Sequence, residues 1–358
     1  MGATDLGRPF LVGWRPAGND PRVASVRIRC LNPLAELRRA QYPVELYDPA
    51  RRETYSAVVF SKIYDDATQA EAARLRESGA WVVLDLCDNH FYDAGSSEVV
   101  RAASARLRRM LGLADELVAS TETMAAVLRE ETGGRTPITV IGDAVETAID
   151  APRTAPWSRW LARRKLRSLL SQLDASAATR LVWFGSHGGP AGEHGMGDLE
   201  TIRPLLESLH GERPLSLTVI SNSAEKFERL ISRWRLPTQY LAWHPATFLE
   251  ALRAHEIALI PIQDTPFTRC KTNNRLVTAL AAGVAVVATG IPSYRPFAGV
   301  AALDDWPGGL RRYIFDPEGR RQAVAAGQAL VQREWTLPLI ADQWRRYFDG
   351  FRERPPRP

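Results

Sequence analysis

The stretch from Lys271 to Gly290 reads KTNNRLVTALAAGVAVVATG and decides the fold class. Lys271, Asn273, Asn274 and Arg275 stand in front of LVTALAAG, an apolar run of small residues that is typical of a helix packed closely on a sheet. Gly283 then leads into VAVVATG, which is typical of a buried strand. A helix that leads directly into a buried strand is the building unit of a parallel α/β sheet.

The same alternation extends over most of the chain. We expect strands at 9–14, 43–48, 57–62, 81–86, 116–120, 138–145, 180–185, 215–221, 238–243 and 257–262. We expect helices at 32–41, 67–79, 97–112, 121–133, 197–211, 225–234 and 247–255. In the first of these, Asn32 is the expected cap and Pro33 the first helical residue.

Residues 146–179 interrupt this rhythm, since they begin with a polar, proline-containing segment and carry no strand. We therefore predict an α/β protein of two doubly wound, Rossmann-like domains that face each other across a cleft. The predicted parts are a first domain at 1–150, a connector at 151–179, a second domain at 180–335 and a C-terminal helix with a flexible tail at 336–358.

Composition narrows the class of protein. The 358 residues are 45% hydrophobic and 24% charged, as in soluble globular proteins, and a net charge of +5 favours an anionic partner. Zinc-finger spacings and aromatic RNA-binding motifs are missing, so nucleic acid is not expected. The three cysteines are far apart, and the N-terminus lacks the pattern of a signal peptide. We expect a cytoplasmic protein with reduced thiols.

Ligands of open parallel sheets bind where strands end and helices begin. After the strand at 180–185 comes a glycine-rich loop with Gly185, Ser186, His187 and Gly188, which lets a ligand approach the backbone closely. The loop matches neither the common dinucleotide-binding pattern nor the common phosphate-binding pattern, and the alternative is a plain flexible loop. His187 and His194 have no carboxylate or cysteine at ligand spacing, so no metal is expected.

Two further junctions carry candidate residues. His244 follows the strand at 238–243 beside Trp243, where it could contact a base or sugar, although Trp243 could equally fill the core. Lys271 and Arg275 precede a helix whose dipole they oppose, unless an anion lies between them and the helix. A diphosphate would be such an anion, and a solvated basic surface is the alternative.

In the first half the polar junction is LDLCDNHFYDAG, at 84–95. Asp85, Asp88, His90 and Asp93 follow a buried strand here. A general base, a group that binds a substrate hydroxyl and a structural loop cap all fit this cluster.

The segment WSRWLARRKLRSLLSQL, at 157–173, combines five basic residues with apolar ones and has no acid. A basic amphipathic helix can lie on an anionic membrane surface. The favoured interpretation is a connecting helix that buries its apolar residues and leaves its charges in solvent.

Four separated segments resemble the GT-B glycosyltransferases, in particular the large retaining, family 4-like group that uses sugar nucleotides. They are 114–130 with 138–146, RLVWFGSHGG at 180–189, LVTALAAGVAVVATGIPSY at 276–294, and EWTLPLIADQWRRYFD at 334–349. The resemblance covers nearly the whole chain. It implies that the C-terminal helix returns to the first domain, that the donor binds in the second domain and that the acceptor binds in the first.

Carried onto this sequence, the resemblance assigns the diphosphate to Lys271 and Arg275. Asn273 and Asn274 would lie near the donor sugar or the phosphates, the loop that begins at Gly185 would cover the phosphates, and Asp88 or His90 would be the catalytic residue near the transferred sugar. Thr278 stands where many members bind the ribose with a glutamate, Cys270 where an earlier glutamate is usual, and Ser186 and His187 where arginine and lysine are common.

The resulting expectation is a glycosyltransferase that moves a sugar from a nucleotide-diphosphate sugar to a sugar, a lipid-linked or a small-molecule acceptor, without cofactor or metal. Contact of 157–173 with the inner membrane face would fit a lipid-linked acceptor. The alternatives are a GT-B epimerase or phosphotransferase, and a non-catalytic protein that binds nucleotide sugars.

Overall fold

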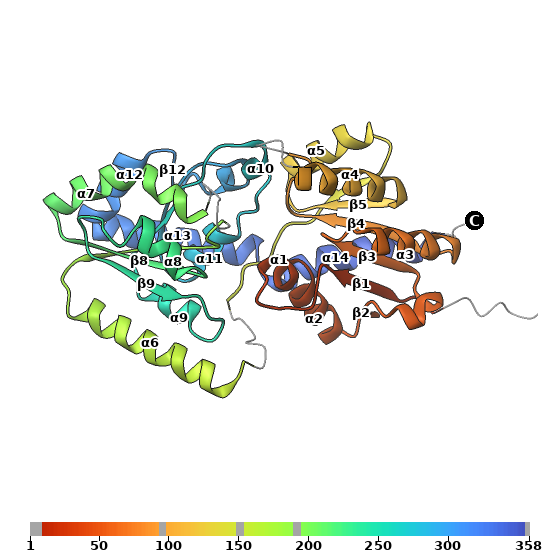
Figure 1. The fold of residues 1–358 in the computed structure, drawn as a ribbon, viewed down its shortest axis with the longest axis horizontal. Helices are drawn as coiled ribbons and strands as arrows, with labels where there is room; N and C mark the ends of the chain where they lie inside the picture. Colours follow the sequence, from red (N-terminus) through yellow and green to blue (C-terminus); the bar gives the residue numbers. More distant parts are fainter. Residues whose placement is uncertain (1–8, 93–97, 148–153, 189–194, 355–358) are drawn as a thin grey trace, which may run out of the picture. The chain divides into compact units, whose positions relative to one another are not determined.

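The computed structural model describes residues 9–92, 98–147, 154–188 and 195–354. They form two compact units (Figure 1). Unit 1 consists of the described residues in 9–144, 269–272 and 335–354, and unit 2 of those in 145–268 and 273–334. The chain therefore passes from one unit to the other at four points, after residues 144, 268, 272 and 334.

Unit 1 is a parallel sheet with helices on both faces. Its strands are β1 (Val12–Pro16), β2 (Val44–Leu46), β3 (Ala57–Ser61), β4 (Trp81–Leu86), β5 (Glu116–Ala119) and β6 (Ile138–Val140). Its helices are α1 (Ala24–Val26), the π-helix η1 (Arg27–Leu31), α2 (Asn32–Arg39), the 3-10 helix η2 (Pro49–Thr54), α3 (Asp66–Glu77), α4 (Glu98–Leu113), α5 (Glu122–Thr132) and α14 (Leu337–Arg352).

The strand order of unit 1 is β2-β1-β3-β4-β5-β6, and every pair is parallel. The chain runs outward from β1 to β2 and returns on the other side of β1 with β3. The carboxyl ends of β1 and β3 therefore flank a point where the winding direction changes, which is where ligands bind in such sheets.

Both faces of this sheet are buried. Val58 and Phe60 of β3 pack with side chains of α3, α4 and α5, whereas Val59 between them packs with Trp14 and with side chains of α2 and α14. Successive residues of a strand face opposite sides of the sheet. This is why β3 is apolar at four consecutive positions and not at alternate ones.

The predicted start of the helix at 32–41 is wrong. The chain is already helical from Ala24, and Asn32 lies inside the helical run with φ −67° and ψ −53°. The Asn32 N–H donates to the carbonyl of Arg27, five residues back, as in a π-helix. Pro33 has no N–H to donate, so a locally widened turn before it lets the helix continue through the proline.

Unit 2 repeats the architecture with a second sheet. Its strands are β7 (Thr179–Phe184), β8 (Leu215–Ser221), β9 (Thr238–Ala242), β10 (Ile257–Ile260), β11 (Ala285–Ala288) and β12 (Ala302–Leu303). Its helices are α6 (Pro156–Asp174), η3 (Gly195–Thr201), α7 (Arg203–Glu212), α8 (Ala224–Leu230), α9 (Phe248–Arg253), α10 (Pro266–Arg269), α11 (Asn274–Ala281), η4 (Pro292–Phe297), α12 (Trp306–Phe315) and α13 (Pro317–Glu334), and Arg269 is counted with unit 1.

The strand order of unit 2 is β12-β11-β10-β7-β8-β9, again with parallel pairs throughout. From β7 the chain runs outward through β8 to β9 and returns beside β7 with β10. The winding direction thus changes between β7 and β10. Fully buried Leu181, Trp183, Leu217 and Val219 form part of one core face.

The basic segment forms α6, which packs on β9 of unit 2. Leu166, Leu169 and Leu173 are buried, as the interpretation of a packed connecting helix requires. Trp160 and Leu161 are also apolar residues of this segment, but they are 58% and 37% exposed. The buried stripe of α6 is therefore narrower than the sequence indicated.

The expected fold class is confirmed, since the two six-stranded parallel sheets with interleaved helices are the architecture predicted. The strand β12 was missed because two residues are too short to show a pattern. The strand expected at 138–145 ends at Val140, and the Ile141 and Gly142 carbonyls that follow it accept hydrogen bonds from Arg29. Each helix in the described part of the chain is too short or too polar to span a lipid bilayer.

Candidate anion-binding sites

The glycine-rich loop of unit 2 begins at the carboxyl end of β7 and is held by three neighbouring side chains. Ser221 Oγ donates to the Gly185 carbonyl at 2.8 Å. Asn222 Oδ1 accepts from the His187 N–H at 3.0 Å, and Lys226 Nζ donates to the His187 carbonyl at 2.7 Å. The described part of the loop, 185–188, therefore has a defined backbone path at the edge of the sheet.

Gly195, at the start of η3, lies against this loop with φ +78°. A Cβ added there would be 2.7 Å from the Ser186 carbonyl oxygen and 2.9 Å from the Gly188 nitrogen. Both contacts are with backbone atoms, which cannot rotate away. The loop can occupy this position only because residue 195 has no side chain.

Replacing Gly195 by alanine is expected to displace residues 186–188 and to lower the free energy of unfolding of unit 2 by about 1–3 kcal/mol, since the substitution combines backbone strain with a steric clash. Amide exchange of peptides over 182–188 should accelerate. Gly197→Ala is the matched control, because a Cβ at Gly197 meets no atom within 4 Å. Equal exchange in the two variants would contradict the prediction.

The first turn of α11 lies on the other side of the β7–β10 junction. Asn273 is the N-cap residue, is 8% exposed, and accepts the Val277 N–H on its carbonyl at 3.0 Å. The Arg275 guanidinium lies close to Gly185, as a Cβ added to Gly185 would be 3.5 Å from Arg275 Nη1. Arg275 also interacts with the hydroxyl of the buried Tyr294, from η4.

The structure thus brings together two stretches that the sequence singled out separately, the loop at 185–188 and the start of α11. Asn274 and Arg275 are half-buried in the first turn of α11, and Thr278 follows Arg275 by about one turn and is 7% exposed. Backbone amides at a helix start, an arginine and a glycine-rich backbone are the groups that bind phosphates.

His244 lies elsewhere in unit 2. It follows β9, the edge strand, which β8 separates from β7. Its Nε2 is 3.3 Å from Ser158 Oγ of α6, and its Nδ1 accepts from the Ala246 N–H at 3.2 Å. Burial, and to a smaller extent Arg159, lowers its pKa. Its described contacts are with α6 and its own turn, and not with the residues around Arg275.

A second group of charged residues lies at the carboxyl ends of β3 and β4 in unit 1. Asp88 is 6% exposed, and its two carboxylate oxygens are contacted by the ammonium groups of Lys62 and Lys271. Burial alone would raise the pKa of Asp88, but the two lysines outweigh it and hold that pKa well below its usual range. Two cations around one carboxylate leave an excess positive charge.

Lys62 is a residue that sequence analysis missed. It directly follows β3, and its φ of +56° is in the left-handed region that a lysine rarely adopts. Its N–H donates to the Asp85 carbonyl at 2.9 Å, which fixes this conformation. Its position in the sequence could have indicated a functional role, since a lysine directly after a buried parallel strand lies at the sheet edge where ligands bind.

His90 lies next to this cluster. Its Nδ1 is 2.7 Å from the Tyr64 hydroxyl, and its Nε2 is 3.9 Å from a carboxylate oxygen of Asp88. Burial, reinforced by the charge of Lys62, lowers the pKa of His90 to about 4. His90 is therefore neutral at pH 7 and can offer one hydrogen-bond donor, but not a positive charge.

We expect no titration of His90 between pH 5 and 8. Because the unfolded chain has a histidine pKa of about 6.5, it binds more protons than the folded state between pH 6.5 and 4. The stability that neutral His90 contributes is complete above pH 6.5 and is lost as the pH falls toward 4. Histidine NMR signals, assigned with His90→Gln, test this. A His90 midpoint near 6.5 would contradict it.

Lys271 belongs to a short segment, 269–272, that is part of unit 1 although its flanking residues belong to unit 2. Cys270 is fully buried in the core of unit 1, and its carbonyl accepts from Thr121 Oγ1 at 3.3 Å. Burial raises the pKa of Cys270 to about 11. The position where the resemblance expects a glutamate is thus occupied by a core residue that anchors Lys271.

Asp93, His194 and Gly189 lie outside the described residues. Asp85, in contrast, is fully enclosed in unit 1, where it pairs with Arg29. Within the described ranges no group of three or more histidine, cysteine, aspartate or glutamate side chains could hold a metal ion.

The fold of the chain is the GT-B glycosyltransferase fold. HepE of Anabaena in complex with UDP matches with a TM-score of 0.64 at 14% identity, over 95% of this chain and 100% of that one. HepE in complex with UDP-glucose matches with a TM-score of 0.63 at 12% identity, over 95% of this chain and 99% of HepE. The α,α-trehalose 6-phosphate synthase of Burkholderia multivorans matches with a TM-score of 0.57 at 14% identity, over 93% of this chain and 78% of the synthase. No protein-family model and no curated protein sequence matches.

Proposed function

We propose that the protein is a glycosyltransferase that takes its donor from a nucleotide-diphosphate sugar. The observation that carries this proposal is the junction of β7 and β10, where the loop at 185–188, the start of α11 and the Arg275 guanidinium lie together. This combination suits a diphosphate, because it joins backbone amides, a helix N-terminus and a cation that can bind bidentately.

Within the donor site, Arg275 would bind the diphosphate, and Asn273, Asn274 and the loop backbone would complete its hydrogen bonds. During transfer the acceptor hydroxyl oxygen forms a bond to the sugar C1 while the bond between C1 and the diphosphate oxygen breaks. Negative charge develops on the diphosphate oxygen, which can take up the proton that the acceptor hydroxyl gives up. A fixed guanidinium stabilises this charge more than it stabilises the bound donor, which lowers the barrier. A cationic side chain can do this without a metal, so we propose metal-independent transfer.

We propose UDP as the nucleotide. The support is the likeness of the fold to HepE, whose structures contain UDP and UDP-glucose, and to UDP-forming trehalose-phosphate synthases. We also propose a relation to the retaining, family 4-like group, and the support is the resemblance of 276–294. Thr278 replaces the usual ribose-binding glutamate, and its short hydroxyl suits a weaker hydrogen bond to the ribose.

In unit 1 we propose that Asp88 is not a general base, because a carboxylate held ionised by two ammonium groups is too weak a base for that role. Its role would be to position Lys62 and Lys271, whose excess charge suits an anionic group of a substrate. Neutral His90 would donate or accept a hydrogen bond at a sugar hydroxyl.

Thermal-shift measurements with UDP, GDP, dTDP and CDP test the proposal. We expect UDP to raise the melting temperature clearly and the others to raise it less. Incubation with UDP-glucose and a panel of sugar, sugar phosphate and lipid-linked acceptors should then release UDP, with the same rate in EDTA as with magnesium. Failure of all four nucleotides to stabilise folded protein would refute the proposed donor site.

A second candidate, a non-catalytic protein that binds nucleotide sugars, is favoured by Thr278 and by the buried Cys270, which stand where the resemblance expects glutamates. It predicts stabilisation by UDP without release of UDP from any donor in the presence of any acceptor. An epimerase would convert the donor without an acceptor, which the same incubation detects.

A further inference from the structure

The first two turns of α6 carry an exposed apolar face. Trp157 is 70% exposed, Trp160 58% and Leu161 37%. These residues are spaced i, i+3 and i+4, so they lie on one side of the helix. Eight large hydrophobic side chains are exposed in the described part of the chain, and three of them lie within these five positions.

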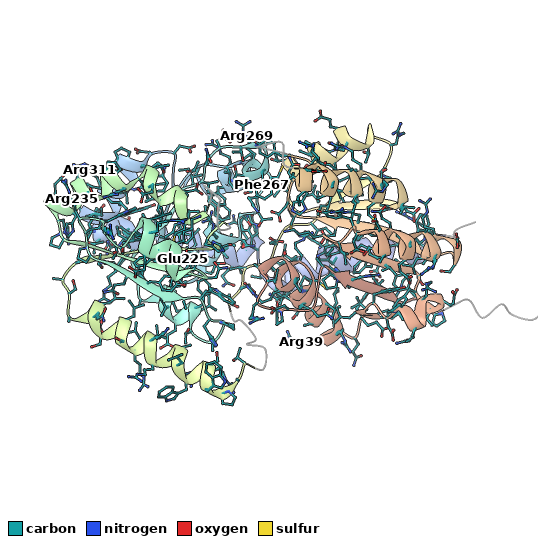
Figure 2. All side chains as sticks on the ribbon, in the orientation of Figure 1. Arg39, Glu225, Arg235, Phe267, Arg269 and Arg311 are labelled. Carbon is teal, nitrogen blue, oxygen red and sulfur yellow. The ribbon has the colours of Figure 1, made fainter. Side chains whose placement is uncertain are left out.

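This face is not the one by which α6 packs on unit 2. At about 100° per residue, Leu166 lies about 180° from Trp157, and Leu169 and Leu173 lie close to Leu166. Those three leucines are buried and hold the helix on β9. Figure 1 shows α6 at the outer edge of unit 2 beside β9, and Figure 2 shows side chains projecting from its other side. The tryptophans are therefore not needed for the packing of unit 2.

Positive charge borders the exposed face on both flanks. Lys165 lies about 80° from Trp157 in one direction and Arg167 about 80° in the other, and Arg164 lies on the face itself. The Arg164 guanidinium lies over the Trp160 ring at 5.7 Å. From Pro156 to Leu173 the helix has no acidic residue, and Asp174 at its last position pairs with Arg180.

We propose that α6 docks unit 2 on the surface of a bilayer that contains anionic lipids. Tryptophan rings prefer the boundary between headgroups and acyl chains. Lysine and arginine on either flank of a helix that lies in that plane reach the lipid phosphates. A solvated basic helix would explain the charges but not the two exposed indoles. The inference is independent of the proposed transfer reaction.

Flotation with phosphatidylcholine vesicles, with and without phosphatidylglycerol, tests the proposal on the full chain. We expect binding only to the anionic vesicles, and weaker binding as salt is added. Trp157→Ala/Trp160→Ala should lower the partition coefficient about tenfold or more, since the buried apolar area is lost. Arg164→Glu/Arg167→Glu should lower it at least about 25-fold, because each basic residue near such a surface contributes about fivefold.

Arg321→Glu/Arg333→Glu is the matched control, because it makes the same change in charge at two exposed arginines of α13. It should change the partition coefficient by less than about threefold, and all variants should keep the wild-type circular dichroism and melting temperature. Absence of binding to anionic vesicles at low salt would overturn the proposal. An equal loss of the partition coefficient in the control variant would also overturn it. The same holds if the α6 substitutions leave vesicle binding intact but abolish binding to RNA or to a protein partner.

Discussion

Replacing Arg275 by alanine is expected to weaken UDP binding about 100-fold and to lower kcat/KM with UDP-glucose by about 10²–10³. A charge-assisted, bidentate hydrogen bond to a phosphate contributes about 1.5–3 kcal/mol to binding, and the same group stabilises the leaving diphosphate in the transition state. Isothermal titration with UDP measures the first effect, and initial rates of UDP release measure the second.

The size of the loss depends on the geometry of the guanidinium, so Arg275→Lys should restore only part of the affinity. Arg311→Ala is the control, because Arg311 is exposed at the outer edge of unit 2 (Figure 2) and pairs with Glu212 there. UDP affinity that is unchanged in Arg275→Ala would show that the diphosphate binds elsewhere, even if UDP itself stabilises the wild-type protein.

Replacing Arg29 by alanine is expected to lower the stability of unit 1 by about 3–5 kcal/mol, because it leaves two buried carboxylates without their counter-ion. Arg29 is 3% exposed and binds both carboxylate oxygens of Asp85. Its Nη1 donates to the carbonyl of Ile141 at 2.7 Å and to Asp143 at 3.1 Å. Amide exchange in β3, β4 and β5 should accelerate by about two to three orders of magnitude at pH 7.

Arg22→Ala is the matched control, since Arg22 also pairs with an aspartate, Asp20, but both side chains are exposed. Such a pair contributes at most about 1 kcal/mol. The loss of stability in Arg29→Lys should lie between the losses in Arg29→Ala and Arg22→Ala, because lysine keeps the charge but loses most of the hydrogen bonds. A wild-type exchange pattern in Arg29→Ala would mean that the network is not required for the fold of unit 1.

The fold could be predicted because it rests on patterns that a single sequence shows. Buried parallel strands such as β3 and β8 are continuous apolar runs, and the helices between them begin and end at recognisable residues. The missed features depend on backbone detail. The widened turn before Pro33 uses a hydrogen bond from Asn32 to Arg27 that no spacing rule indicates, and β12 is too short to form a pattern.

The candidate site was predictable in part. Asp88, His90 and the loop from Gly185 could be predicted because they directly follow strands. Arg275 could be predicted because a cation at the start of a helix opposes the helix dipole unless an anion binds there. What a sequence does not show is which charges pair. Asp88 looks like a free acid in the chain, but contacts with Lys62 and Lys271, 183 residues away in sequence, change what it can do. For the same reason, the exposure of Trp160 could not be read from the apolar pattern of α6.

The return of the last helix to unit 1 has a consequence for the order in which the chain folds during synthesis. Trp344 and Phe348 of α14 are fully buried against Trp14, near the other end of the chain. The part of this sheet face that α2 does not cover therefore stays uncovered until α14 has left the ribosome, whereas all residues of unit 2 are available earlier. A nascent chain stalled before residue 335 should need a chaperone to shield that face.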